Sequence, residues 1–197
     1  MKIVSLFLLF AMSLFAQPLE NIYEQLCVTY ERIESYEAVF TQYNFWQEAD
    51  ISKISSGKIY YNLHNLLLDY VEPAGQKLIV SDSAVVIYDD VSKQAMISNN
   101  DDTAIRPQDI LSKYWHNSKK EILNNSEKLQ IIKLINSENS QIIVEISEDL
   151  IAKITIIDEN ENSVEYIFSD VKINQKLPKD IFGFQISNDV NVLDTRE

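Results

Sequence analysis

The sequence predicts a mainly β protein in which about ten antiparallel strands form one curled sheet, with two amphipathic helices over its opening. Three observations support this fold class. Short apolar segments with a period of two recur at regular spacing, polar turns separate them, and two segments have helical periodicity instead. No Gly/Ser-rich linker or change of composition divides the chain, so residues 17–197 are expected to form one domain.

The first 16 residues are expected to be a cleavable signal peptide. Lys2 supplies a positive charge, residues 3–15 are apolar apart from two serines, and Ala16 precedes Gln17 and Pro18. A permanent membrane anchor is the alternative, but the apolar run is shorter than the roughly 20 residues that a membrane span needs. The mature protein is therefore expected to be exported and soluble.

An amphipathic helix is expected to begin near Pro18. Its apolar residues, spaced 3, 4, 4 and 3 apart, are Leu19, Ile22, Leu26, Tyr30 and Ile33. Such a stripe must cover an apolar surface. After Ser35 the period changes to two, which places Tyr36, Ala38 and Phe40 on one face of a strand.

The remaining elements are predicted from the same two periods. The expected strands before the second helix are 51–61, 66–71, 77–81, 84–88 and 94–98. The second helix opens at Arg106-Pro107 and contains Ile110, Leu111, Tyr114 and Trp115. The expected strands after it are 129–134, 141–146, 150–157 and 163–173, and then a tail strand over 182–192. This order predicts an antiparallel meander that a helix interrupts once.

Composition excludes several classes of function. The chain has 17 Lys and Arg residues but 30 Asp and Glu residues, and the resulting formal net charge of −13 argues against nucleic-acid binding. Three scattered glycines form no phosphate-binding loop. Cys27, His64 and His116 lack metal-ligand spacing, so no metal or cofactor is expected. The acidic cluster at 158–162 lacks the ligand periodicity and the glycine of a calcium loop, which favours a solvated turn.

An enzyme is not expected. An acyl hydrolase needs a nucleophile and a base, yet no G-x-S-x-G motif occurs, and neither His64 nor His116 has a serine or carboxylate partner within a motif. A structural β module without a ligand is a further alternative. A curled sheet either fills its interior with its own side chains or holds one apolar ligand, and the residues alone do not distinguish these outcomes.

Three stretches resemble the LolA family of outer-membrane lipoprotein carriers. Residues 35–42 follow the N-terminal helix and are similar to the family's A-x-F-x-Q strand. Residues 57–95 resemble its central run, which has a glycine-led strand, an aromatic strand ending in Pro, an I-V-S-D-G turn and a W-x-Y strand. Residues 168–192 are similar to its F-x-F…V-x-V ending. The matches keep the family's order over nearly the whole mature chain.

The resemblance implies an incomplete antiparallel β-barrel of about ten or eleven strands, lidded by α-helices. It also implies a periplasmic carrier that receives acylated lipoproteins from an inner-membrane ABC transporter and passes them to an outer-membrane acceptor, without covalent chemistry. Direct transfer between such proteins favours a monomer. The alternative on the same scaffold is a carrier or sensor of another lipid-like ligand.

This chain departs from the family pattern between its second and third strands. The family usually has an Arg there, which is thought to tie the lid helices shut, whereas this chain has Leu63 followed by His64. His64 is the candidate substitute, and a plain surface histidine is the alternative. Ser83 and Asp189 replace turn glycines of the family, a change that short polar residues tolerate. The gating of the lid is the property that these departures affect.

The cavity of a lipoprotein carrier should be apolar, because an exposed acyl chain costs about 0.8 kcal/mol per CH₂. Alternation places Leu66, Leu68 and Tyr70 on one face of a strand and Asp69 on the other. We expect the lipid-binding surface to comprise Phe40, Ile59, Tyr61, Leu66, Leu68, Tyr70 and Ile87, with Leu111 and Trp115 from the second helix. Ordinary core packing is the alternative at each position.

Overall fold

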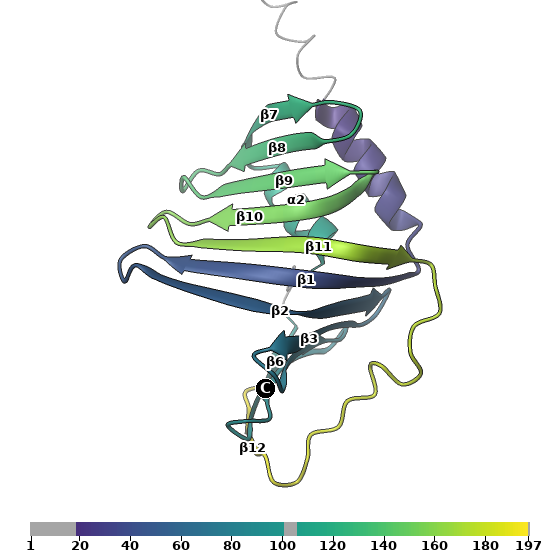
Figure 1. The fold of residues 1–197 in the computed structure, drawn as a ribbon, viewed down its shortest axis with the longest axis vertical. Coiled ribbons are helices and arrows are strands. Elements are labelled where there is room, and N and C mark those ends of the chain that lie inside the picture. The colour runs from purple at the N-terminus through teal and green to yellow at the C-terminus, as the bar shows by residue number, and fades with distance from the viewer. Residues whose placement is uncertain (1–18, 101–105, 197) are drawn as a thin grey trace, which may run out of the picture.

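The computed structural model describes residues 19–100 and 106–196, which form one open 12-stranded sheet with two helices on one of its faces (Figure 1). We call the face that carries the helices the inner face. The predicted fold class, a mainly β protein with an incomplete antiparallel barrel lidded by helices, is confirmed. The expected signal peptide lies outside the described residues.

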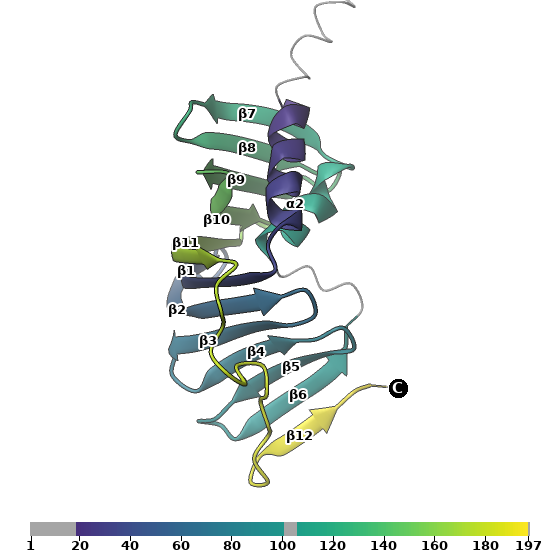
Figure 2. The same cartoon turned by 90° about the vertical axis from the view of Figure 1, so that its right-hand side faces the viewer.

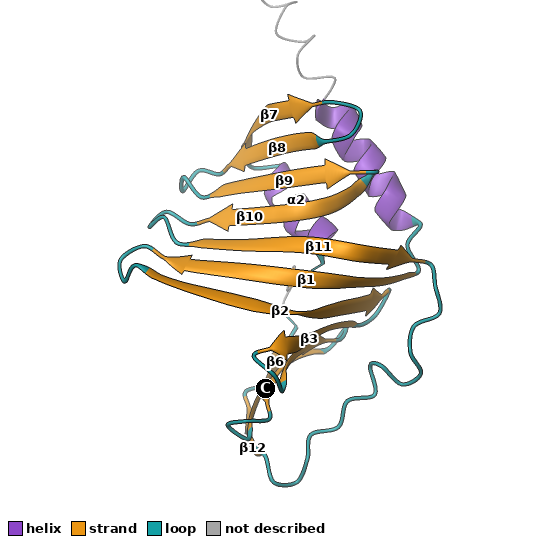
Figure 3. Ribbon diagram, in the orientation of Figure 1, coloured by secondary structure: helices purple, strands orange, loops and turns teal. Residues whose placement is uncertain are grey.

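Along the described chain one helix is followed by six strands, a second helix and six more strands, and Figure 3 distinguishes the helices from the strands by colour. An N-terminal helix is described over residues 19–31. The first six strands are β1 (Ser35–Trp46), β2 (Ile51–Asn62), β3 (Leu66–Glu72), β4 (Gln76–Val80), β5 (Ala84–Asp89) and β6 (Gln94–Asn99). Helix α2 (Pro107–Trp115) follows. The remaining strands are β7 (Lys119–Asn125), β8 (Gln130–Ile135), β9 (Gln141–Ser147), β10 (Leu150–Ile157), β11 (Ser163–Ile173) and β12 (Asn191–Asp194).

Strand β1 lies in the middle of the sheet and joins two meanders. The strand order is β12-β6-β5-β4-β3-β2-β1-β11-β10-β9-β8-β7. Every described pair is antiparallel except β12 with β6, which is parallel because the chain crosses from β11 to the far edge before β12 begins. Figure 1 shows the two meanders above and below β1 and the long connection on the right.

The strand count exceeds the expected ten or eleven because β7 was not predicted. Its sequence, KKEILNN, has few apolar residues, and its burial alternates weakly, as is common for a charged edge strand. The predicted tail strand over 182–192 was largely wrong. Only Asn191–Asp194 forms a strand, and the preceding segment uses Phe184, Ile186 and Val190 to pack against Tyr88 and Ala95.

The N-terminal helix packs against the inner face of the meander formed by β7–β11. The predicted stripe residues Leu19, Ile22, Leu26 and Tyr30 are all buried. They belong to the same core cluster as the fully buried sheet residues Ile132, Leu134, Ile142, Val144, Ile151 and Ile154. The Tyr30 hydroxyl accepts a hydrogen bond from the Ile151 backbone N–H at 3.1 Å, which fixes the end of the helix to β10.

Helix α2 is anchored to the N-terminal helix rather than to the sheet alone. The rings of Tyr23 and Trp115 stack at a centroid distance of 4.0 Å, and the Trp115 indole donates a hydrogen bond to Glu20 at 3.2 Å. Leu111 is fully buried in the same core cluster. The two helices therefore form one packed unit.

This helical unit covers only half of the inner face. Figure 2 shows both helices over the half that contains β7–β11, and neither over the end formed by β4, β5, β6 and β12. Side chains at that end are consequently exposed although they are apolar, as Ile87, Met96 and Leu193 demonstrate. The expectation that helices lid the sheet thus holds for one half of it.

Gly57 in β2 allows β1 and β3 to bring their aromatic rings together. It pairs with Phe40 on one side and Tyr70 on the other, and these two rings meet edge to face at 5.1 Å. A Cβ at position 57 would lie 2.2 Å from the backbone oxygen of Asp69. Because backbone atoms cannot move aside without breaking the ladder, only glycine fits at this point.

We predict that Gly57→Ala lowers the free energy of unfolding by about 3 kcal/mol or more, because the added methyl forces β2 and β3 apart. Denaturant unfolding measures this change. The matched control is Gly183→Ala, whose Cβ would come no nearer than 3.2 Å to its closest neighbour, the Asp180 backbone oxygen. A similar, small loss in both variants would contradict the close approach at Gly57.

Candidate functional site

Seven apolar side chains form one continuous row across the inner face. Each pairs directly with the next on neighbouring strands, from β1 through β6 to β12. We call this the apolar row, and it consists of Ala38, Ile59, Leu68, Leu78, Ile87, Met96 and Leu193. With strands about 4.8 Å apart, the row spans roughly 29 Å.

The apolar row is buried at one end and exposed at the other. Ala38 and Ile59 are each 1% exposed and Leu68 is 3% exposed, whereas Ile87 is 48% and Leu193 is 59% exposed. Its first three members lie in the core, and two of them line a pocket with residues of α2, whereas neither helix lies over the strands that carry the last three (Figure 2). A ligand on the row would therefore contact both α2 and the sheet near Leu68 and only the sheet near Leu193.

A covered pocket of about 280 Å³ lies where the row passes under α2. From the sheet it is lined by Ile59, Leu68, Leu78, Ile156, Val164, Tyr166 and Phe168. From α2 it is lined by Ile110, Lys113 and Tyr114. Nine of these ten residues are aliphatic or aromatic and Lys113 is the exception, so the pocket suits hydrocarbon better than a polar ligand.

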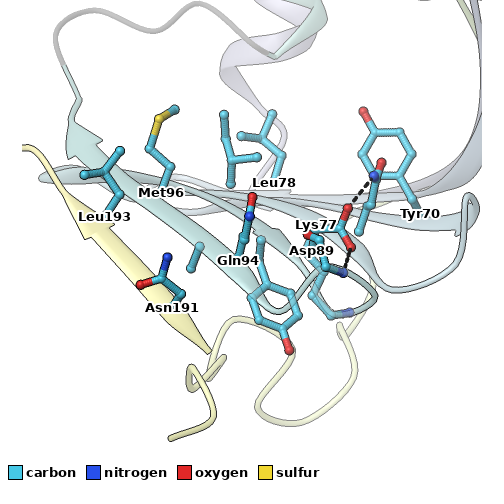
Figure 4. Close-up of a pocket in the computed structure, with 13 residues that line it drawn as sticks. Tyr70, Lys77, Leu78, Asp89, Gln94, Met96, Asn191 and Leu193 are labelled. Atoms are coloured by element: carbon cyan, nitrogen blue, oxygen red, sulfur yellow. Dashed lines mark hydrogen bonds between the residues drawn. The ribbon is translucent and has the colours of Figure 1, made fainter. Parts of the chain in front are cut away.

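An open groove of about 640 Å³ continues from this pocket along the uncovered strands. Leu78 lines both spaces, which makes them neighbours. Figure 4 shows Leu78, Met96 and Leu193 projecting from the same side of the sheet into the groove. Both volumes together match the size of a site for a lipid-sized ligand.

A second row, which is polar, runs beside the apolar row in the open groove. Gln76, Asp89, Gln94 and Asn191 pair across β4, β5, β6 and β12, and we call them the polar row. The Gln76 amide donates to Asp89 at 2.9 Å, and the Ser92 backbone N–H donates to the same carboxylate at 3.1 Å. These hydrogen bonds hold the pKa of Asp89 below its usual range, so the carboxylate is ionised at neutral pH.

Four of the residues predicted to bind lipid line the two spaces. Ile59 and Leu68 line the covered pocket, and Tyr70 and Ile87 line the open groove. They lie together on the inner face, as alternation predicted. The Tyr70 hydroxyl donates to Gln42 at 3.0 Å, and its ring meets that of Phe40 edge to face.

The other five predicted residues are packed within the core. Phe40 contacts Tyr70, and the Tyr61 ring stacks on Tyr36 at 4.5 Å. Leu111 and Trp115 hold α2 against the N-terminal helix. Leu66 borders a polar pocket of about 70 Å³ at the β2–β3 turn.

Sequence reasoning missed several residues that line the site. Ile110 and Tyr114 are one helical turn apart and belong to the apolar residues expected in the second helix, and Leu78 is the cross-strand partner of the predicted Leu68. Those signals were present in the sequence. Leu193 was not recoverable, because no local pattern reveals that the last strand pairs in parallel with β6.

At the β2–β3 turn, where the sequence departs from the family pattern, His64 contacts an acidic residue of another turn. His64 Nδ1 lies 2.8 Å from a carboxylate oxygen of Asp82 in the β4–β5 turn, and both side chains are exposed. His64 thus links two turns of the sheet. Arg106, the N-cap residue of α2, pairs with Asp109 at 2.6 Å and lines the same small pocket as these turns.

The two spaces on the inner face have the character of a binding site for an apolar ligand. Within residues 19–100 and 106–196, no group of three or more His, Cys, Asp or Glu side chains is placed to hold a metal ion. The helices of that same part of the chain are too short or too polar to cross a bilayer. Both spaces on the inner face instead offer apolar walls, and the open groove adds a row of hydrogen-bonding side chains.

A family model supports the same kind of function. The model described as outer membrane lipoprotein carrier protein LolA matches residues 31–185. A comparison with curated protein sequences finds no significant match. The family description names a carrier rather than a catalyst, and binding of a lipid or lipoprotein is the function that it indicates.

Solved structures show the same fold at low sequence identity. An uncharacterized conserved protein from Thermus thermophilus is 9% identical, with a TM-score of 0.59 over 90% of this chain and 99% of that one. The MucA/MucB complex of Pseudomonas aeruginosa gives 12% identity and a TM-score of 0.53, covering 89% of this chain and 62% of that one. Mycobacterium tuberculosis lipoprotein LppX is 12% identical, with a TM-score of 0.51 over 82% of this chain and 98% of that one.

The buried tyrosines beside the site allow a stability test. The hydroxyls of Tyr36 and Tyr61 are buried and have no hydrogen-bond partner among residues 19–100 and 106–196, and burial raises the pKa of both. We predict that Tyr36→Phe or Tyr61→Phe leaves the free energy of unfolding unchanged or raises it by up to about 1 kcal/mol, because an unpaired polar group is removed. The measurement is denaturant unfolding.

Tyr30→Phe is the matched comparison, because the Tyr30 hydroxyl accepts the Ile151 N–H. Its loss leaves a buried donor unpaired, so we expect destabilisation by about 1–3 kcal/mol. If Tyr36→Phe proved as costly as Tyr30→Phe, the Tyr36 hydroxyl would have a partner after all.

Proposed function

Because this chain belongs to the LolA family of outer membrane lipoprotein carrier proteins, we propose that it is a periplasmic carrier that binds the acyl chains of lipoproteins along the apolar row. It receives them from an inner-membrane ABC transporter and passes them to an outer-membrane acceptor. The observation that supports this most directly is the continuity of the row from the covered pocket into the open groove.

The apolar row can remove part of an acyl chain from contact with water. Moving hydrocarbon out of water is favourable by about 0.8 kcal/mol per CH₂. The covered pocket surrounds a chain from both the sheet and α2, whereas the open groove contacts it from the sheet side. Successive parts of one chain would therefore be held with decreasing strength.

Graded burial suits a carrier that must also release its cargo. A fully enclosed chain would leave only after the helices separated, and the Tyr23–Trp115 stack and the buried Leu111 oppose that separation. The exposed end of the row provides a place where an acceptor can make contact while the covered part is still occupied. Transfer would then proceed from the Leu193 end toward α2.

The identity of the cargo is tested by recovering the protein from its native host and identifying what co-purifies by mass spectrometry. Intact lipoprotein supports the proposed carrier. A free lipid in its place would favour the alternative function, a carrier or sensor of another lipid-like ligand. Recovery from the periplasmic fraction tests the proposed location in the same experiment.

We predict that Ile87→Asp weakens binding of a synthetic triacylated lipopeptide by at least about tenfold, because a carboxylate interrupts the apolar row where burial of one Ile side chain is worth roughly 1.5–3 kcal/mol. Ile87 is already half exposed, so its replacement should leave the fold intact. Titration with the lipopeptide measures the affinity, and circular dichroism checks the sheet.

The matched control for this change is Ile54→Asp. Ile54 is similarly exposed and pairs with Tyr43 on β1, but it points to the outer face of the sheet. Affinity should remain unchanged in this variant. Equal losses at positions 54 and 87 would show that added negative charge, and not the apolar row, governs binding. The deeper variant Leu68→Asp should abolish loading if the covered pocket is occupied.

A further inference from the structure

The polar row is the hydrophilic flank that the open groove offers to a ligand on the apolar row. On the other flank, Val80 and Val85 pair across β4 and β5, and both are buried. The polar row lies two residues along each strand from the apolar row, which is a distance of about 7 Å. A head group attached to a chain in the groove is therefore expected beside Gln76, Asp89, Gln94 and Asn191.

The charge of this flank is negative. Two residues that line the groove carry a formal charge, Lys77 and Asp89. Lys77 alternates with Leu78 and forms an ion pair with its cross-strand partner Asp69, so its side chain belongs to the outer face. Asp89 faces the groove between Gln76 and Gln94.

The structure also keeps Asp89 ionised and in place. The Gln76 amide binds one carboxylate oxygen, and the backbone N–H groups of Val91 and Ser92 bind the other. The neighbouring Gln94 and Asn191 are exposed and add uncharged donors and acceptors. The excess of acidic residues in the chain as a whole adds to the negative potential.

We infer that the polar row selects the head group of the ligand, accepting neutral or cationic amphiphiles and rejecting anionic phospholipids. This inference rests on the proposed function and specifies its substrate class. An acylated glyceryl group with ester, thioether and amide linkages carries no charge at the lipid itself and fits beside Gln94 and Asn191. A phosphodiester would be placed next to the Asp89 carboxylate and would be repelled.

The test compares three ligands that share one palmitoyl chain and differ in head group. They are palmitoylcholine, monopalmitoylglycerol and palmitoyl lysophosphatidylglycerol, each used below its micelle concentration to displace the neutral fluorophore N-phenyl-1-naphthylamine. At low ionic strength we expect the anionic lipid to bind about three- to tenfold more weakly than the neutral one, as one like charge at this distance requires. High salt should reduce the difference.

Two variants assign the effect to the polar row. Asp89→Asn keeps an acceptor for the Val91 and Ser92 N–H groups but removes the charge, and it should bring the anionic and neutral lipids to nearly equal affinity. Gln94→Lys adds a positive charge beside Asp89 without altering that turn, and it should favour the anionic lipid. The control is Asp90→Asn, which removes the same charge one residue away, where Asp90 pairs with Lys93 and Tyr88; it should keep the wild-type preference.

The outcomes separate the two proposals. Equal affinity of the wild-type protein for all three lipids would overturn the head-group inference and leave the carrier function standing. If none of the three palmitoyl lipids displaced the fluorophore, both the head-group inference and the carrier function would be overturned. A change of preference in Asp90→Asn as large as that in Asp89→Asn would overturn the assignment to the polar row.

Discussion

The register of the antiparallel ladder is the constraint on which this site depends. An apolar row across seven strands exists only if every neighbouring pair is aligned so that each member points to the inner face. A slip of one residue in any strand would turn its side chain to the outer face. Gly57 contributes to this alignment, because it lets β2 and β3 approach closely where the register shifts between Ser56 and Gly57.

The position of the helices then divides the inner face into two environments. The apolar row runs through both of them, and the polar row accompanies it only in the open groove. Because the N-terminal helix and α2 pack on each other through Tyr23 and Trp115, they cover one end of that face as a unit. The apolar row therefore passes from a filled core through a covered pocket into an open groove because the helices lie over only part of the sheet.

Strict periodicity made much of the fold predictable from the sequence. The helix stripe and most strands of both meanders were predicted close to their observed bounds, because half-buried strands and amphipathic helices repeat with distinct periods. Strand β7 was missed because its side chains are mostly polar. The tail was misassigned because Phe184 and Ile186 alternate as in a strand, yet they pack on Tyr88 and Ala95 without pairing to a neighbour.

The candidate site was predictable in part for the same reason. Alternation identified inward residues such as Ile59, Leu68 and Ile87, but it could not separate those that line a space from those, such as Phe40, that are sealed in the core. That distinction depends on what lies above each position. Met96 and Leu193 are nearly a hundred residues apart, and only the tertiary structure shows that they are neighbours.

The short strand β12 has a consequence for access to the groove. Its four residues are all exposed, and its ladder joins it to β6 alone, while a long segment without regular structure connects it to β11. Peripheral strands with so few contacts open locally at small free-energy cost. The outer wall of the groove is thus its least stable part, and transient fraying of this wall would widen the entrance for a bulky guest without any rearrangement of the helical pair.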